Sequence, residues 1–150
     1  DLLVLSHHHT YGTPVIISRC SNNFGPRQHE EKLVPKMIAR TLEDQKLPIY
    51  GSGNQIRNWI HVKDHCEAIA MLIEQGKIGE IYNIAGDEEV SNIDLVKKII
   101  HSLGRSESLI EHVEDRPGHD FRYGLDGGKL REMGWRPKIT LKEGLDDLIS

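Results

Sequence analysis

The sequence is poor in cysteine, in aromatic residues and in long apolar runs, and each shortage excludes a class of protein. Its two cysteines, Cys20 and Cys66, are too few for a disulfide framework, and neither lies in a CxxC pair typical of redox or zinc motifs. No apolar run approaches the roughly 18 residues of a membrane span, and no signal peptide opens the chain. We therefore expect a cytoplasmic protein without membrane contact, in which both thiols are reduced and buried.

Basic residues are also scarce relative to acidic ones. Lys and Arg number 19 against 23 Asp and Glu, which gives a net charge of -4. A general nucleic-acid binder is normally basic, so nucleic acid is not an expected partner. The run His7-His8-His9 suggests a metal site, but successive helical residues point about 100° apart and do not converge on one ion. We expect a polar, exposed helix there and no bound metal.

Helix-like and strand-like segments alternate through the 150 residues. Residues 14–19 are rich in β-branched side chains, as in a strand buried on both faces of a parallel sheet. Asp64, Ser91 and Asp126 are expected helix N-caps, and Thr140 with Glu143 is an expected capping box. The expected helices are 1–11, 32–42, 64–75, 91–103, 126–134 and 141–149, and the expected strands are 14–19, 47–50, 59–62, 81–85 and 109–113. This alternation predicts an α/β fold with at least some parallel strand pairing.

Polar loops follow several of these strands, where open α/β sheets place their ligands. In the expected loop 21–28, the amides of Asn22 and Asn23 suit sugar hydroxyls or phosphate oxygens, or they cap a local turn. Arg57 follows a glycine-bearing turn and offers a fork for phosphate, or it forms a surface salt bridge. Tyr50 is placed to stack on a flat base, or it belongs to the core.

Two later loops have the same ambiguity. Asn92 begins an expected helix, where anions and hydroxyls are favoured, or it serves ordinary helix capping, which is the simpler explanation. The segment 115–120 concentrates Arg, His and carboxylates around a Pro-Gly turn and suits a diphosphate or ribose, or it is a solvated loop. No GxxxxGK[ST], GxGxxG, GxSxG or HExxH motif is present, so the residues alone do not reveal a reaction.

At these same loops the sequence resembles the dTDP-glucose 4,6-dehydratases of the extended short-chain dehydrogenase/reductase superfamily. The resemblance covers essentially the whole chain. It implies the C-terminal, substrate-binding part of such an enzyme, with residues 1–20 ending the nucleotide-binding domain and 21–150 forming mostly the sugar-nucleotide domain. The matching stretches are RCSNNFGP (19–26), EKLVP (31–35), LPIYG (47–51), QIRNW (55–59), YNIAG (82–86), DRPGHD (115–120) and residues 130–137.

By position, the resemblance also implies a role for individual residues. Asn23 would touch NAD, a cofactor held mainly by an N-terminal half. The residues implied to bind the dTDP-sugar are Asn22 at the hexose, Lys32 and Leu33 at the diphosphate and sugar, Pro48, Ile49 and Tyr50 at the thymine, Arg57 at the diphosphate, Asn92 at the nucleotide, and Asp115, Arg116, Pro117, Gly118 and His119 closing over it.

The departures from the family pattern lie in what the chain does not contain. The family's first half carries a GxxGxxG turn, a Thr-Asp-Glu acid/base set and a Tyr-x-x-x-Lys pair, and none occurs here. We therefore expect no dehydratase activity from this chain alone, exposed apolar faces at 2–5 and 15–17, and a homodimer only for the intact enzyme. The alternatives are another sugar-nucleotide epimerase or decarboxylase, and a stand-alone nucleotide-binding module without catalysis.

Overall fold

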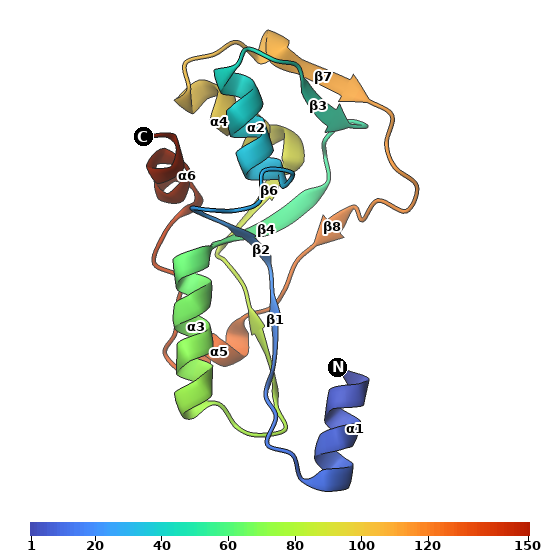
Figure 1. The fold of residues 1–150 in the computed structure, drawn as a ribbon, viewed down its shortest axis with the longest axis vertical. Helices are drawn as coiled ribbons and strands as arrows, with labels where there is room; N and C mark the ends of the chain where they lie inside the picture. The colour runs from blue at the N-terminus through green and yellow to red at the C-terminus, as the bar shows by residue number, and fades with distance from the viewer.

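A computed structural model describes residues 1–150 and gives a mixed α/β fold, as the alternating sequence pattern predicts (Figure 1). The helices are α1 (Leu2–Tyr11), α2 (Leu33–Leu42), α3 (Val62–Gln75), α4 (Asn92–Ser102), α5 (Gly128–Glu132) and α6 (Leu141–Ile149), with a 3₁₀ turn at Glu107–Leu109. The strands are β1 (Ile17–Cys20), β2 (Asn22–Phe24), β3 (Leu47–Tyr50), β4 (Ile56–His61), β5 (Ile81–Ile84), β6 (Glu88–Ser91), β7 (Ile110–Val113) and β8 (Arg122–Tyr123).

The strands form three small sheets, and β4 is the centre of the largest. β4 pairs in parallel with β2 and β8 and antiparallel with β6, so Arg57 lies opposite Tyr123 on one side and Val90 on the other. β1 pairs with β5, and β3 pairs with β7, both in parallel. The predicted parallel pairing is confirmed, and the arrangement places the end of β3 and the start of β4 beside the segment that follows β7.

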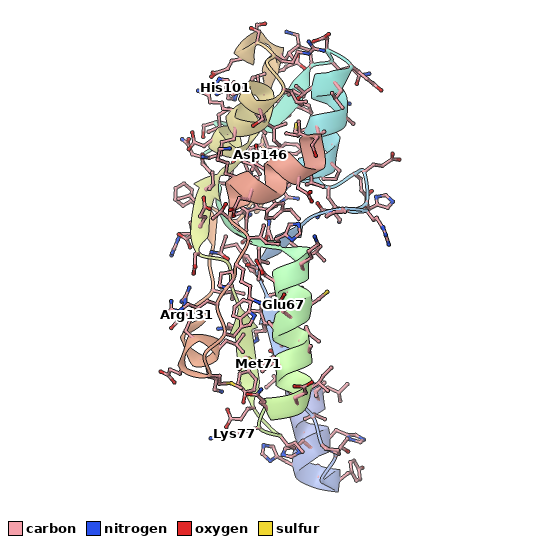
Figure 2. All side chains as sticks on the ribbon, turned by 90° about the vertical axis from the view of Figure 1, so that its left-hand side faces the viewer. Glu67, Met71, Lys77, His101, Arg131 and Asp146 are labelled. Carbon is pink, nitrogen blue, oxygen red and sulfur yellow. The ribbon has the colours of Figure 1, made fainter.

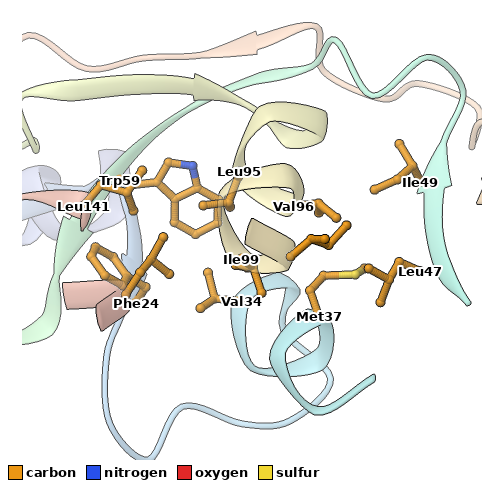
Figure 3. Packing of buried hydrophobic residues seen from close by; sticks show 12 residues of the cluster. Phe24, Val34, Met37, Leu47, Ile49, Trp59, Leu95, Val96, Ile99 and Leu141 are labelled. Carbon is orange, nitrogen blue, oxygen red and sulfur yellow. The ribbon is translucent and has the colours of Figure 1, made fainter. Parts of the chain in front are cut away.

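Two hydrophobic cores lie on either side of β4. Successive strand residues point to opposite faces, so Trp59 packs with α2, α4 and α6, while Ile60 packs with α3, β5 and α5. Figure 3 shows the first core, in which Leu95 and Ile99 of α4 lie between Trp59 and Met37. Figure 2 shows the molecule to be elongated, with α4 and α6 toward one end and α1 at the other.

Several predicted helix ends are confirmed, and two are wrong. Gly12 ends α1 in the left-handed conformation, and Ser91 and the Thr140 capping box begin α4 and α6 as predicted. The N-cap of α3 is His61 rather than Asp64, because the His61 ring accepts a hydrogen bond from the Lys63 amide. Helix α5 spans Gly128–Glu132 rather than 126–134, and its N-cap is Gly127 rather than Asp126, whose carboxylate accepts from the amide of Gly128.

Some strand predictions also need correction. β1 begins only at Ile17, and Ser18 and Arg19, which point to opposite faces of the strand, are both exposed, so β1 is not buried on both faces as predicted. The segment 21–28, predicted to be a loop, contains β2, which pairs in parallel with residues 59–61 of β4. β4 starts three residues before the predicted Trp59, and β6 and β8 were not predicted. β2, β6 and β8 were not predictable from local sequence, because each is formed by hydrogen bonds to β4, which is distant in the sequence.

The exposure of apolar and sulfur-bearing residues is mixed. Cys66 is exposed and Cys20 half-buried, so the prediction that both thiols are buried is wrong; both are free. Leu2 and Leu3 are 85% and 81% exposed, as predicted, whereas Ile17 is buried against the second core's strand β5. Every helix falls short of the length and apolarity needed to cross a bilayer.

Candidate functional site

A cleft of about 380 Å³ gathers most of the predicted substrate residues from segments far apart in the sequence. It lies between α2, β3, the start of α4 and the segment after β7, with β4 beneath it. The lining residues are Asn22, Glu31, Lys32, Leu33, Lys36, Met37, Pro48, Ile49, Tyr50, Arg57, Trp59, Asn92, Arg116 and His119. Of the predicted set, Asp115, Pro117 and Gly118 support the loop without lining the cleft, and Asn23 lies elsewhere.

Arg57 is a buried cation in the wall of this cleft. Only 8% of the residue is exposed, and both of its hydrogen bonds go to main-chain carbonyls, those of Ile56 at 2.7 Å and Asp120 at 2.9 Å. No carboxylate is paired with it, so the surface salt bridge considered from the sequence is absent. A buried charge normally has a counter-charge, and a guanidinium has five donors, so the site has unmet capacity for an anion.

Further basic groups surround the same cleft. Lys32, the N-cap residue of α2, and Lys36, one turn later, both line it, and Arg116 does so from the opposite loop. Glu31 is the one acidic lining residue, and its carboxylate lies 3.9 Å from the Lys32 ammonium. The balance of charge in the cleft is therefore positive, although the whole chain is acidic.

The other end of the cleft is aromatic and apolar. Tyr50 is 47% exposed, and its ring meets that of His119 edge to face at 6.3 Å between centroids. Pro48 and Ile49 complete this wall from β3. An exposed aromatic ring beside an imidazole and aliphatic groups has the chemistry that suits a flat heterocycle, and this wall adjoins the cationic one.

Asp115 fixes the His119 side chain at this end. The Asp115 carboxylate accepts from the His119 ring at 2.7 Å and from the Arg116 amide at 2.9 Å, and its second oxygen accepts from Gln55 at 2.8 Å. The His119 hydrogen bond, with smaller contributions from the Arg116 amide and Gln55, holds the pKa of Asp115 below its ordinary value. The carboxylate therefore stays ionised and keeps the imidazole in place.

The turn 51–55 joins the walls of the cleft. The Gly51 amide donates to Val113, the Gly53 carbonyl accepts from Ile93, and the Gln55 carbonyl accepts from Asn92. Gly51 has φ +56°, and an added Cβ would meet the Asp115 carboxylate at 3.0 Å. A side chain at Gly51 would therefore strain the backbone and crowd the loop that carries Arg116 and His119.

The two asparagines of β2 differ in what holds them. Asn22 lines the cleft, and its side-chain amide makes no hydrogen bond within the chain. The Asn23 amide donates to the Ser21 carbonyl at 3.1 Å and its oxygen contacts the His65 ring at 2.8 Å. Asn23 lines a separate hollow of about 160 Å³ beside Gln28, whose buried side-chain oxygen has no partner and can accept from a ligand.

Some cleft residues were not singled out from the sequence. Lys36 lies four residues after Lys32, a spacing that places both on one helix face and could have identified it. Trp59 lies two residues after Arg57 on the same strand and so faces the same side. Gln55, which lies behind the cleft rather than in its lining, gave no usable signal, because its partner Asp115 is distant in sequence.

Known proteins match this chain along its whole length. The family model for GDP-mannose 4,6 dehydratase matches residues 1–148. The low-salt glycan biosynthesis protein Agl12 of Haloferax volcanii is 47% identical over 146 residues, which cover 97% of this chain and 47% of Agl12. A dTDP-glucose 4,6-dehydratase from Streptomyces niveus is 43% identical over 150 residues, covering 99% of this chain and 45% of the relative.

A solved structure agrees with these relatives. DesIV, a dTDP-glucose 4,6-dehydratase from Streptomyces venezuelae with NAD and TDP bound, matches with a TM-score of 0.96 and 45% identity. The match covers 99% of this chain and 47% of DesIV. The chain thus spans about half the length of the relatives that it matches.

Proposed function

This chain belongs to the GDP-mannose 4,6-dehydratase family of the extended short-chain dehydrogenase/reductases, and from that membership we propose that it supplies the nucleotide-sugar-holding part of a dTDP-glucose 4,6-dehydratase. The observation that carries the proposal is the buried, unpaired guanidinium of Arg57 between a basic wall and an aromatic one. A nucleoside diphosphate needs both kinds of wall, a cationic one for its phosphates and an apolar, aromatic one for its base.

The roles proposed for the cleft residues are those that the resemblance implies, and their chemistry suits them. Arg57 binds the diphosphate with its free donors, and Lys32 with Leu33 lines the diphosphate and sugar end. Asn22 offers an unengaged amide to the hexose, and Asn92 adds a contact at the start of α4.

The thymine lies against the wall made by Pro48, Ile49 and Tyr50. The loop from Asp115 through Arg116, Pro117 and Gly118 to His119 covers the nucleotide, and His119 forms the edge of the base site. The tight turn at Gly118 has φ +67°, which favours glycine there.

In the complete enzyme, NAD would supply reversible hydride transfer for the conversion of dTDP-glucose to its 4-keto-6-deoxy product and water. Asn23 is this chain's contact to that cofactor, and the unpartnered acceptor of Gln28 beside it suits a hydroxyl or carboxamide donor. This chain contributes by binding and orienting the sugar nucleotide, which lowers the entropic cost of bringing the sugar to the reacting groups.

Because the chain carries neither GxxGxxG nor Tyr-x-x-x-Lys, we propose that it does not turn over dTDP-glucose by itself. From the family resemblance we also propose that the intact enzyme is a homodimer. Incubation with dTDP-glucose and NAD, followed by detection of the 4-keto product by its absorbance in alkali, tests the first statement. Product formation by the 150-residue chain would contradict it.

Nucleotide preference separates this proposal from a UDP-sugar epimerase or decarboxylase. In isothermal titration of this chain, we expect dTDP to bind more tightly than UDP, and thymidine monophosphate to bind less tightly than dTDP because it lacks one phosphate. Tighter binding of UDP would favour the epimerase alternative, and binding of neither nucleotide would reject the proposed cleft.

A further inference from the structure

We propose that Gln55 is a positioning residue for the base end of the cleft, which holds Asp115, and through it His119, in the place where the nucleotide is recognised. This inference rests on the proposed function, since it concerns the same cleft. Gln55 does not line the cleft, so its effect on a ligand must pass through the residues that it holds.

The side chain of Gln55 reaches one wall of the cleft. The residue is only 7% exposed, and its amide nitrogen donates to the Asp115 carboxylate at 2.8 Å. The other oxygen of that carboxylate meets Nδ1 of His119 at 2.7 Å. Because an ionised carboxylate only accepts hydrogen bonds, Nδ1 carries the proton of this contact, which fixes the orientation of the His119 ring.

The main chain of Gln55 reaches another wall. Its carbonyl accepts from the amide of Asn92 at 3.0 Å, at the first residue of α4, while the next amide, that of Ile56, donates to Phe121 at 2.8 Å. Residue 55 is thus bonded to the α4 start and adjoins the loop that ends in β8. These main-chain hydrogen bonds hold the start of α4 and the segment before β8 at a fixed distance from each other.

The amide oxygen of Gln55 shows why this side chain need not contribute much to the stability of the fold. This oxygen is buried and has no hydrogen-bond partner, which is unfavourable for folding. Replacing glutamine by methionine removes the unpaired acceptor together with the donor to Asp115, and the exposed Asp115 carboxylate regains water. Losing the unpaired acceptor raises stability and losing the bond to Asp115 lowers it, so the two changes oppose each other. Nothing replaces the lost contact that helps to place His119.

The test compares Gln55→Met with Gln45→Met, a matched change at an exposed glutamine whose side chain is bonded to Glu43. We expect Gln55→Met to weaken dTDP binding roughly tenfold, the loss of about one hydrogen bond to a charged group, while the melting temperature stays near that of the wild type. Gln45→Met should change neither quantity. Unchanged dTDP affinity, or a loss of affinity accompanied by an equally severe loss of stability, would overturn the inference.

A measurement on the ligand-free protein separates this inference from the proposed function. By NMR titration, we expect Gln55→Met to raise the pKa of Asp115 and to broaden the His119 ring signals as the ring loses a single position. If wild-type protein fails to bind dTDP but these changes appear, the proposed function fails and the positioning role stands. If dTDP binds and neither signal moves in the variant, the positioning role fails alone.

A double variant tests the route through Asp115. If Gln55 acts through that carboxylate, Gln55→Met should weaken dTDP binding much less in an Asp115→Asn background than in the wild type. Additive losses would show that Gln55 acts independently of Asp115 and would contradict the proposed route.

Discussion

Replacing Arg57 by lysine should cost dTDP affinity without changing thymidine affinity. Lysine keeps the positive charge but loses the planar fork that a diphosphate engages with two parallel hydrogen bonds. In the structure, two of the guanidinium donors already serve the carbonyls of Ile56 and Asp120, so a bound phosphate must use the remaining ones. A single ammonium cannot serve both the loop and the phosphate as well.

The magnitude follows from the number of bonds lost. Hydrogen bonds to charged groups contribute about 1.5–3 kcal/mol each, and lysine retains one of the two parallel phosphate contacts. The expected loss is therefore about 1.5–3 kcal/mol, which corresponds to a roughly 10- to 150-fold increase in the Kd for dTDP. Thymidine has no phosphate, so its affinity should change less than about threefold.

The assay is a pair of isothermal titrations, with dTDP and with thymidine, at low and moderate salt. Arg40→Lys is the matched control, because Arg40 also donates to a main-chain carbonyl, that of Lys46, but lies outside the cleft. Equal losses for dTDP and thymidine in Arg57→Lys would mean that Arg57 only supports the loop. An unchanged dTDP affinity would refute the assignment of the diphosphate to this residue.

Three further predictions concern stability. Thr140→Ala breaks the capping box of α6 and should lower the free energy of unfolding by about 1 kcal/mol in urea denaturation; a change near zero would contradict the cap's role. Leu95→Ala empties a fully buried position against Trp59 and should cost about 2–5 kcal/mol, measured in the same way, whereas a loss below about 1 kcal/mol would mean that the core collapses around the gap. Burial lowers the pKa of His61 and of His65, so the folded state binds fewer protons than the unfolded state below the ordinary value of 6.5. Stability should therefore be complete above pH 6.5 and fall as the pH drops through the lower folded-state values, and a flat profile between pH 7.5 and 5.5 would show that burial does not disfavour the charged rings.

Local signals predicted the elements whose stability is local. The capping box at Thr140, the Ser91 cap and the left-handed Gly12 were all readable, because each depends on residues within one helical turn. β2, β6 and β8 were missed, because each is defined by pairing with β4 rather than by its own composition. The exposed outer face of β1 was likewise not predictable, since burial of a strand depends on which segments pack against it.

The site followed the same division. Residues named because of their chemistry, such as Arg57, Tyr50 and Asn92, do lie together in one cleft. Their spacing in the sequence did not predict that they would lie together. The family resemblance predicted it, and the structure supplies the geometry. The supporting contact between Gln55 and Asp115 joins residues far apart in the sequence, and only the fold brings them to hydrogen-bond distance.

The most direct test of the account is an NMR titration of the 150-residue chain with dTDP, following amide and side-chain signals. The account predicts saturable shifts centred on Tyr50, Arg57, Asn92 and His119, with the Arg57 side-chain signals moving for dTDP but not for thymidine. Shifts confined to residues outside the cleft, or no saturable shift at millimolar dTDP, would contradict the claim that this chain holds the nucleotide.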